Sequence, residues 1–385
     1  MRDRAARRRA VTEEQGRPRV LIAADKFKGS LTAVEVAERV GAGLRSARPG
    51  LAVEALPVAD GGDGTVAAAV AAGFTRHEAA VTGPLGEPRT AAFALRADTA
   101  VVEMAEASGL QHLPPGRFAP RTATTYGTGE LLRAALDAGA RSIVLGVGGS
   151  ATTDGGAGML TALGARFLDG TGAPVGPGGG GLAALGRADL SGLDPRLAAV
   201  DLVLASDVDN PLTGEHGAAA VYGPQKGADP EDVAALDAAL VHYADVLEAG
   251  ARAQAPGAGA AGGLGYGALV GLGARFRPGI EVLLDVLGFA PALERADLVV
   301  TGEGSLDAQT LRGKAPAGVA AAARARGVEV VAVCGRLALA PEEVRAAGIA
   351  AAYPLTSLEP DVDTCVREAG PLLERLAARI ARERL

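Results

Sequence analysis

Residues 142–159, SIVLGVGGSATTDGGAGM, constrain the fold of this 385-residue chain more than any other stretch. They begin with an apolar run typical of a buried strand, break into glycines and hydroxyl residues, and then resume an Ala/Leu/Met pattern typical of a helix. Glycines let backbone N–H groups approach an oxyanion closely, and a helix N-terminus favours negative charge. The stretch therefore predicts an anion site in an α/β fold, with phosphate as the leading ligand.

Two other interpretations of this stretch stay open. Residues 146–151 also match the G-x-G-x-x-A pattern of dinucleotide sites, and Asp169 follows about 20 residues later, as an NAD(P)-dependent dehydrogenase of a small hydroxy acid would require. A similar glycine pattern at residues 257–262 has no strand before it, so the 55 glycines of the chain produce such matches by chance. The third interpretation is that the glycines only form a tight turn. For the whole chain, a non-enzymatic Ala/Gly-rich binding protein is a further alternative.

Composition narrows the class of protein. The net charge of −7 disfavours binding to nucleic acid or to an anionic membrane. A hydrophobic content of 48% with only 3% aromatic residues suits packed α/β layers. The two cysteines, Cys334 and Cys365, are too few for a disulfide framework and predict buried thiols in a reducing cytoplasm. The uncharged run 253–274 is rich in glycine and predicts a loop rather than a membrane span.

Lysine and asparagine are rare enough in this chain to be informative. Only four of the 38 basic residues are lysine, and Asn210 is the single asparagine. Arginine's planar fork does not replace a compact ammonium group at a phosphate or carboxylate, so the surviving lysines are candidates for ligand contacts. Surface residues without function are the alternative, although every lysine lies in a loop marked by Gly, Ser or Pro. These lysines are Lys26, Lys28, Lys226 and Lys314.

Polar residues follow the predicted strands at both ends of the chain. Asp25 and Lys28 follow a strand at 20–24, and a helix with a Thr32–Glu35 capping-box spacing comes next. The sequence DGGDG at 60–64 follows a strand at 51–58, and TGEGSLD at 301–307 follows a strand at 298–300. Ligands of α/β sheets bind at the carboxyl ends of strands, so we expect these residues to form binding sites.

The pattern predicts two α/β domains with a cleft between them. Strands and helices alternate regularly at both chain ends, which predicts a discontinuous Rossmann-like domain of residues 20–66 and 290–385. The middle, residues 67–289, is less regular and predicts an inserted mixed α/β domain, with a hairpin at 78–95 and a long helix at 230–251. Residues 1–19 predict a disordered leader. The sequence indicates no oligomeric state.

These residue types together favour phosphoryl transfer. Lysines and helix N-termini hold phosphates, carboxylates hold Mg²⁺, and a further carboxylate accepts the proton of the attacking hydroxyl. No Walker A motif is present, because the segment around Lys314 lacks the upstream glycine and the Ser/Thr. The protein-kinase signature set is absent as well.

Seven motifs in order resemble those of the type I bacterial glycerate kinases, from about Val20 to the C-terminal helix. Asp63 stands where that family often has Glu, and Lys26 where many members have Ser. Residues 1–19 have no counterpart. The motifs are DKFKGSLT (25–32), ADGGDGT (59–65), YGTGEL (126–131), GGSAT (148–152), SDVDNPL (206–212), GPQKG (223–227) and TGEGSLD (301–307).

The resemblance implies ATP-dependent phosphorylation of D-glycerate with Mg²⁺, giving 2-phosphoglycerate or 3-phosphoglycerate and ADP. We expect Asp207 to act as general base and Lys28 to contact the substrate carboxylate or the transferred phosphoryl group. Competing metal ligands are Asp63, Glu303 and Asp307, with Asp60 as a further candidate. The expected substrate-binding residues are Asp25, Ser30, Asp60, Gly61, Gly62, Asn210 and Lys226, and the expected ATP-binding residues are Gly148, Gly149, Ser150, Thr152, Gly155, Gly156 and Lys314.

Overall fold

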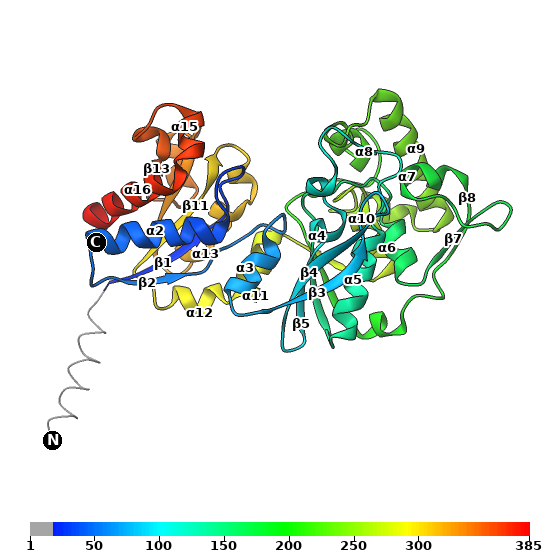
Figure 1. Ribbon diagram of the computed structural model, residues 1–385, viewed down its shortest axis with the longest axis horizontal. Helices are drawn as coiled ribbons and strands as arrows, with labels where there is room; N and C mark the ends of the chain where they lie inside the picture. The colour runs from blue at the N-terminus through cyan, green and yellow to red at the C-terminus, as the bar shows by residue number, and fades with distance from the viewer. Residues whose placement is uncertain (1–17) are drawn as a thin grey trace, which may run out of the picture. The chain divides into compact units, whose positions relative to one another are not determined.

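The computed structural model describes residues 18–385, which divide into two compact units (Figure 1). Unit 1 contains residues 18–59 and 284–385, and unit 2 contains residues 60–283. Residues 1–17, most of the expected leader, lie outside the described residues, and Arg19 already belongs to a strand. The unit boundaries fall before the expected ones at 66 and 290. The reason at the first boundary is that helix α3 (Thr65–Ala71) packs on the strands of unit 2.

Unit 1 is built on a five-stranded sheet in the order β13-β12-β11-β1-β2. Every pair is parallel, and β1 lies between β2 and β11, with Ile22 in register with Ala55 and Val300. This confirms the α/β fold that was predicted from the strand–helix alternation. The strands are β1 (Arg19–Ala24), β2 (Ala52–Ala55), β11 (Leu298–Leu306), β12 (Glu329–Leu337) and β13 (Ala351–Pro354).

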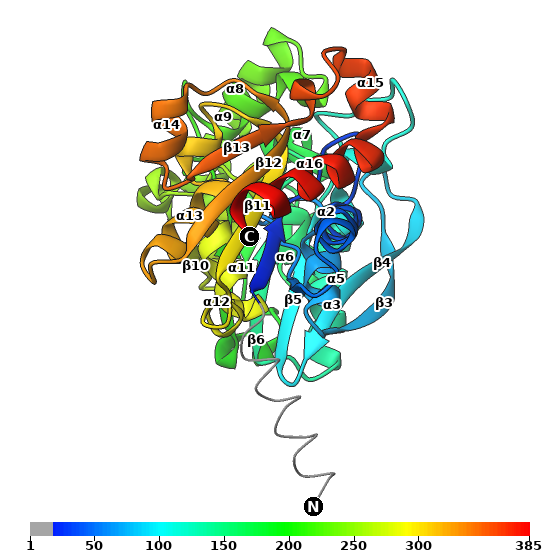
Figure 2. The same ribbon diagram turned by 90° about the vertical axis from the view of Figure 1, so that its left-hand side faces the viewer.

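Helices cover both faces of this sheet, as Figure 2 shows. Helices α2 and α16 pack together on one face, and α13 packs on β11 and β12 on the other. Right-handed crossovers require this, because the chain moves across the sheet in opposite directions from β1 and from β11. The helices are α2 (Ala33–Ala47), α12 (Phe289–Leu293), α13 (Ala315–Arg324), α14 (Pro341–Ala346), α15 (Val362–Arg367) and α16 (Ala369–Arg384).

The N-terminus of α2 has the predicted capping box. Glu35 N–H donates to Thr32 Oγ1 at 3.2 Å, and Thr32 N–H donates to Glu35 Oε2 at 2.8 Å. The apolar side of α2, including Val36, Val40 and Leu44, is fully buried between the sheet and α16. The capping box therefore determines where α2 begins, and its apolar side determines which face is buried, as the sequence pattern predicted.

Unit 2 is built on a six-stranded mixed sheet in the order β10-β9-β6-β5-β4-β3. Strands β5, β6, β9 and β10 are parallel, whereas β3 and β4 form the expected antiparallel hairpin. The parallel strands carry the polar loops of the site on their carboxyl ends. The strands are β3 (Thr75–Thr82), β4 (Pro88–Arg96), β5 (Thr99–Glu103), β6 (Ser142–Gly146), β9 (Asp201–Ala205) and β10 (Arg275–Arg277).

A two-stranded ribbon and a glycine-rich helix in unit 2 were not predicted. The ribbon pairs β7 (Arg166–Asp169) with β8 (Leu185–Asp189). Helix α10 (Leu264–Gly271) lies in the uncharged run that was expected to be a loop; its glycines allow close packing, since a Cβ at Gly267 would lie 2.8 Å from Gly155 O. The other helices are α4 (Ala105–Ser108), α5 (Tyr126–Asp137), α6 (Ala157–Ala162), α7 (Gly178–Gly181), α8 (Ala218–Tyr222), α9 (Pro230–Val246) and α11 (Gly279–Leu287), which crosses the unit boundary.

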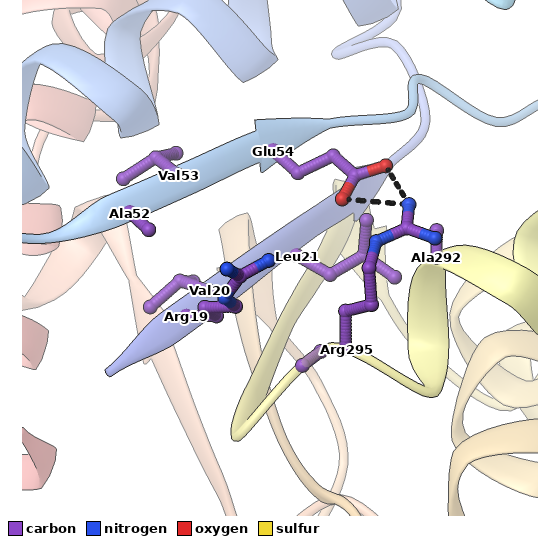
Figure 3. A pocket seen from close by; sticks show the side chains of 9 residues that line it. Arg19, Val20, Leu21, Ala52, Val53, Glu54, Ala292 and Arg295 are labelled. Atoms are coloured by element: carbon purple, nitrogen blue, oxygen red, sulfur yellow. Dashed lines mark hydrogen bonds and ion pairs between the residues drawn. The ribbon is translucent and has the colours of Figure 1, made fainter. Parts of the chain in front are cut away.

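A shallow hollow of about 170 Å³ in unit 1 lies beside edge strand β2 (Figure 3). Arg295 donates to both carboxylate oxygens of Glu54, at 2.8 and 3.1 Å, and thereby ties the segment after α12 to this strand. Both side chains are about half exposed, so the pair contributes little to stability. Arg19, the first residue of β1, also lines the hollow. In the part of the chain that the structure describes, no helix is long and apolar enough to span a bilayer.

We expect Gly43→Ala to lower the free energy of unfolding, because α2 and α16 approach closely at Gly43. A Cβ there would lie 2.8 Å from Ala377 Cβ and would overlap the Glu374 carbonyl oxygen. Such overpacking costs about 1–3 kcal/mol, more than the helix propensity gained from alanine. Urea unfolding measures the change. Gly50→Ala is the matched control, since no atom lies within 4 Å of a Cβ at that position; equal stability of the two variants would contradict the packing.

Candidate active site

The carboxyl ends of the parallel strands in unit 2 meet a loop of residues 60–64. Gly148, just after β6, donates its N–H to Gly61 O at 3.1 Å. Gly61 lies against the end of β9, because a Cβ at Gly61 would be 2.6 Å from Ala205 O. The loop therefore crosses the ends of β6 and β9. This is the edge at which α/β sheets bind their ligands.

Glycine is required where these segments touch. Gly61 has a φ of +91°, which side-chain-bearing residues rarely adopt. A Cβ at Gly146 would lie 2.7 Å from Gly61 O, and one at Gly148 would overlap the Cα of Gly62. The two segments are therefore in direct backbone contact, which no other residue type permits. Their glycines serve this contact as well as any approach of a ligand.

Three carboxylates lie on or beside this contact. Asp207 follows β9 and accepts a hydrogen bond from Gly279 N–H, after β10, at 2.9 Å. A Cβ at Gly279 would be 3.2 Å from Asp207 Oδ1 and would overlap Asp60 O, so Asp207 and the 60–64 loop share this neighbour. The Asp63 carboxylate lies against the exposed Gly149. The structure thus brings together the predicted residues Asp60, Gly61, Gly62, Asp63, Gly148, Gly149 and Asp207.

Glu103 belongs to the same edge, although the sequence analysis gave it no role. It is the last residue of β5 and is only 2% exposed. Its carboxylate accepts hydrogen bonds from Gly64 N–H at 3.2 Å and Val66 N–H at 3.1 Å, which fixes the end of the 60–64 loop. Burial raises the pKa of Glu103 to about 7, against the lowering effect of these hydrogen bonds. An acidic residue that ends a strand was the signal in the sequence.

The N-terminus of α6 is occupied by a carboxylate of the protein itself. Asp154 is buried and accepts hydrogen bonds from Gly156 N–H at 3.1 Å and Gly158 N–H at 3.3 Å. Gly155 N–H donates to Gly262 O at 3.0 Å. The expected phosphate-binding residues Gly155 and Gly156 therefore have their N–H groups bound internally, and burial raises the pKa of Asp154.

Lys226 and Asn210, both expected to bind substrate, have partners within the protein. Lys226 is 1% exposed, and its Nζ donates to the carbonyl oxygen of Thr152 at 2.6 Å. Burial lowers the pKa of Lys226 to about 7, partly offset by the charge of Asp154. Asn210 donates to His216 O at 2.9 Å and accepts from the Tyr222 hydroxyl at 2.8 Å. Ser150 and Thr152 are buried as well.

Unit 1 carries a second set of polar groups at the ends of β1 and β11. In chain order its strands run 2-1-3-4-5 across the sheet, so the direction of winding reverses between β1 and β11. Sheets of this order bind ligands outside that reversal point. Asp25 follows β1 and is buried, whereas Lys28 is exposed. Ser30 donates its hydroxyl to Val366 O at 2.7 Å.

Glu303, Asp307 and Lys314 lie around the end of β11. Glu303 accepts a short hydrogen bond from Thr310 Oγ1, and its other oxygen lies 3.9 Å from Lys314 Nζ. Lys314 precedes the first residue of α13. Asp307 accepts from Gln309 N–H at 2.8 Å and thereby caps a turn. Within residues 18–385, no three Asp, Glu, His or Cys side chains form a metal-binding group.

The geometry contradicts the dinucleotide interpretation of residues 146–151. That interpretation requires an acidic residue at the end of the next parallel strand of the same sheet. Asp169 instead ends β7, which pairs antiparallel with β8 outside the six-stranded sheet. Its carboxylate is held in a local turn by the Thr171 hydroxyl at 2.7 Å and Thr171 N–H at 2.8 Å, and these two hydrogen bonds lower the pKa of Asp169.

Carboxylates and glycine loops at one parallel sheet edge, and lysines with carboxylates at another, are groups suited to a phosphotransferase of the α/β class. The sequence model of the glycerate kinase family matches residues 20–384. Glycerate kinase of Bacillus subtilis (strain 168) is 47% identical over 369 residues, covering 94% of this chain and 97% of that protein. Glycerate 2-kinase of Escherichia coli (strain K12) is 43% identical over 370 residues, with the same coverages.

A solved structure agrees with these relatives. The crystal structure from Salmonella typhimurium LT2 of a protein provisionally named glycerate kinase 2 has a TM-score of 0.82 and 42% sequence identity. The match covers 95% of this chain and 98% of that chain. The chain therefore belongs to the glycerate kinase family, and the resemblance found in its motifs is confirmed. It is an enzyme that transfers a phosphoryl group, which excludes the dehydrogenase and the non-enzymatic binding protein.

We expect Lys226→Met to change how stability depends on pH. The pKa of Lys226 is about 7 in the folded protein and 10.5 ordinarily, so between these values the unfolded chain holds the extra proton. The free energy of unfolding therefore rises with pH in this window, by up to about 1.4 kcal/mol per pH unit from this group, and the rise is lost as pH falls toward 7. Urea unfolding across the window should show a shallower slope for Lys226→Met. An unchanged slope would contradict the burial, and Lys28→Met, at an exposed lysine, is the control.

Proposed function

We propose that the chain transfers the γ-phosphoryl group of ATP to a hydroxyl of D-glycerate, with Mg²⁺, forming phosphoglycerate and ADP. Membership of the glycerate kinase family supports this substrate, and the two polar sheet edges supply groups suited to each part of the reaction. The observation that carries the proposal is the position of Asp207, held by Gly279 N–H beside the 60–64 loop.

Asp207 is the proposed general base. Gly279 N–H binds Oδ1 at 2.9 Å and so fixes the orientation of the carboxylate. A fixed carboxylate within hydrogen-bond reach of a hydroxyl can accept its proton as the hydroxyl oxygen attacks the γ-phosphorus. The bond from that phosphorus to the β,γ-bridging oxygen then breaks, and ADP leaves with the electron pair. Exposed Asp209, two residues away, has no comparable backbone anchor among the hydrogen bonds described for residues 18–385.

We assign Mg²⁺ to Asp60 and Asp63. Magnesium is usually held by one or two carboxylates together with substrate phosphates and waters, so a preformed group of three ligands is not required. Asp63 lies against exposed Gly149, a residue of the loop that we assign to the ATP phosphates. Glu303 and Asp307, which bind Thr310, Lys314 and Gln309 around the end of β11, are the alternative metal ligands. Bound Mg²⁺ would neutralise charge on the transferred phosphoryl group.

Lys28 and Lys314 are the proposed cationic groups of unit 1. Lys28 is exposed on the loop after β1, and we assign its ammonium group to the glycerate carboxylate or the transferred phosphoryl group. Lys314 stands at the N-terminus of α13, a ten-residue helix whose dipole favours an anion at the same place. We assign Lys314 to the ATP phosphates, with Glu303 orienting its ammonium group.

We further propose that the product is 2-phosphoglycerate. The Escherichia coli relative is named glycerate 2-kinase, and it is 43% identical over nearly the whole of both chains. Phosphorus and proton NMR of the product distinguish attachment at the 2-hydroxyl from attachment at the 3-hydroxyl. We place the reaction in the cytoplasm, where the buried free thiols of Cys334 and Cys365 stay reduced.

We expect Asp207→Asn to lower kcat by about 100-fold or more, because the amide keeps the shape of the carboxylate but accepts no proton. The KM values for ATP and glycerate should change little. An assay coupled to ADP formation measures both. Asp209→Asn is the matched control and should retain wild-type turnover. Near-wild-type kcat for Asp207→Asn would remove Asp207 from the role of base.

A further inference from the structure

A pocket of about 340 Å³ in unit 2 is lined by residues of α6, of ribbon strand β7 and of the segment that leads into α7. Figure 1 labels these three elements. Its volume falls in the range of small-molecule sites. Phe167, Leu168, Val175 and Leu182 supply apolar walls. None of the residues assigned so far to glycerate, Mg²⁺ or the phosphates lines it. The pocket therefore has no role in the reaction as described above.

The polar groups of the pocket show which ligands suit it. Thr124 and Tyr126 line one side, and the buried carboxylate of Asp154 lies beside them. Asp154 already accepts hydrogen bonds from Thr125 N–H and Thr125 Oγ1, both at 2.8 Å, and from Gly158 N–H. The guanidinium group of Arg166 binds Asp189 at 2.6 Å. Carboxylate and apolar surface, without an uncommitted cation, disfavour an anionic ligand and favour a neutral one.

The two proposed substrates differ in charge and polarity. Glycerate is small, polar throughout and negatively charged. ATP carries its charge on the phosphates, whereas its adenine ring and ribose are neutral and present flat apolar faces with hydrogen-bonding edges. The pocket has apolar walls and hydroxyl groups on one side. Of the parts of the two proposed substrates, only the nucleoside of ATP is complementary to such a lining.

The pocket also lies close along the chain to the loop assigned to the phosphates. Asp154 lines the pocket, and Ser150 lies four residues earlier, directly after Gly148 and Gly149. A chain of this length spans at most about 14 Å, so the pocket wall and the phosphate loop are near neighbours. Lys226 reinforces the link, because its buried ammonium group holds Thr152 O midway between them. A ribose with its phosphates can bridge such a separation.

We propose that this pocket binds the adenosine part of ATP, a role that rests on the proposed kinase function. The adenine ring packs against Phe167, Leu168 and Val175, and the hydroxyl groups of Thr124 and Tyr126 contact its polar edge or the ribose. Nucleotide specificity then arises in this pocket. The glycine loop at the sheet edge contributes only to phosphate binding.

Two glycines of the ribbon region give a matched test. Gly176 lines the pocket and Gly170 does not. Neither has an atom within 4 Å of a Cβ placed on it, and neither has a positive φ, so both accept a side chain. The chain contains no tryptophan, so Gly176→Trp and Gly170→Trp each introduce a single tryptophan, whose emission can be excited apart from that of the tyrosines. Val175→Trp adds a second pocket variant.

We expect both pocket variants to raise the KM for ATP about tenfold or more, with kcat at saturating ATP and the KM for glycerate within about twofold of wild type. Adenosine should compete with ATP in the wild-type enzyme. Its addition should shift the tryptophan emission of Gly176→Trp and leave that of Gly170→Trp unchanged. Gly170→Trp should keep all wild-type constants.

An unchanged KM for ATP in both pocket variants would overturn the proposal, and so would adenosine that neither competes nor alters their fluorescence. Wild-type turnover is measured first, because it tests the proposed kinase function independently of the adenosine pocket. If the enzyme forms ADP from ATP and D-glycerate but the pocket variants behave like wild type, only the adenosine pocket is ruled out. Absence of that turnover removes the proposed function itself, whereas adenosine binding to the pocket would still be seen directly.

Discussion

Direct backbone contact between two glycine segments is the constraint on which the candidate site depends. Gly61 and Gly62 lie against Gly146 and Gly148 so closely that a single Cβ would separate them. This contact holds the 60–64 loop across the ends of β6 and β9 and thereby places Asp60 and Asp63 beside the loop that carries Asp207. Neighbouring carboxylates repel one another, so a rigid backbone is needed to keep them close together.

Buried charged side chains also hold the loops of the candidate site in place. Glu103 binds N–H groups at the end of the 60–64 loop and at the start of α3, and Asp154 binds those at the N-termini of α5 and α6. Lys226 adds a buried cation on the carbonyl of Thr152. Each of these charged groups is more costly to bury than an apolar residue, which is why their pKa values move toward the neutral form. We interpret them as positioning groups for the loops and not as ligands of substrate.

Sequence reasoning predicted the parts of the fold that follow from local patterns. The α2 capping box, the β3–β4 hairpin and the strands of unit 1 were all predicted from spacing and alternation. The pairing of β7 with β8 and helix α10 were not predicted, because strand pairing depends on tertiary contacts and the glycine-rich run of α10 carries no periodic signal. The same limit applies to the site. Strand-end residues such as Asp60 and Asp207 were found, whereas the burial of Lys226 and the internal use of the Gly155 and Gly156 N–H groups depend on distant segments.

The measurement that tests the central claim most directly is the turnover of Gly148→Ala. An added methyl group would overlap Gly62 Cα and push the 60–64 loop away from the sheet edge, while the rest of unit 2 keeps its packing. The account predicts a loss of kcat of about 100-fold or more. The circular dichroism spectrum should be like that of Gly170→Ala, because a Cβ at Gly170 would meet no atom within 4 Å. Wild-type kcat in a folded Gly148→Ala variant would show that the backbone contact does not organise the active site.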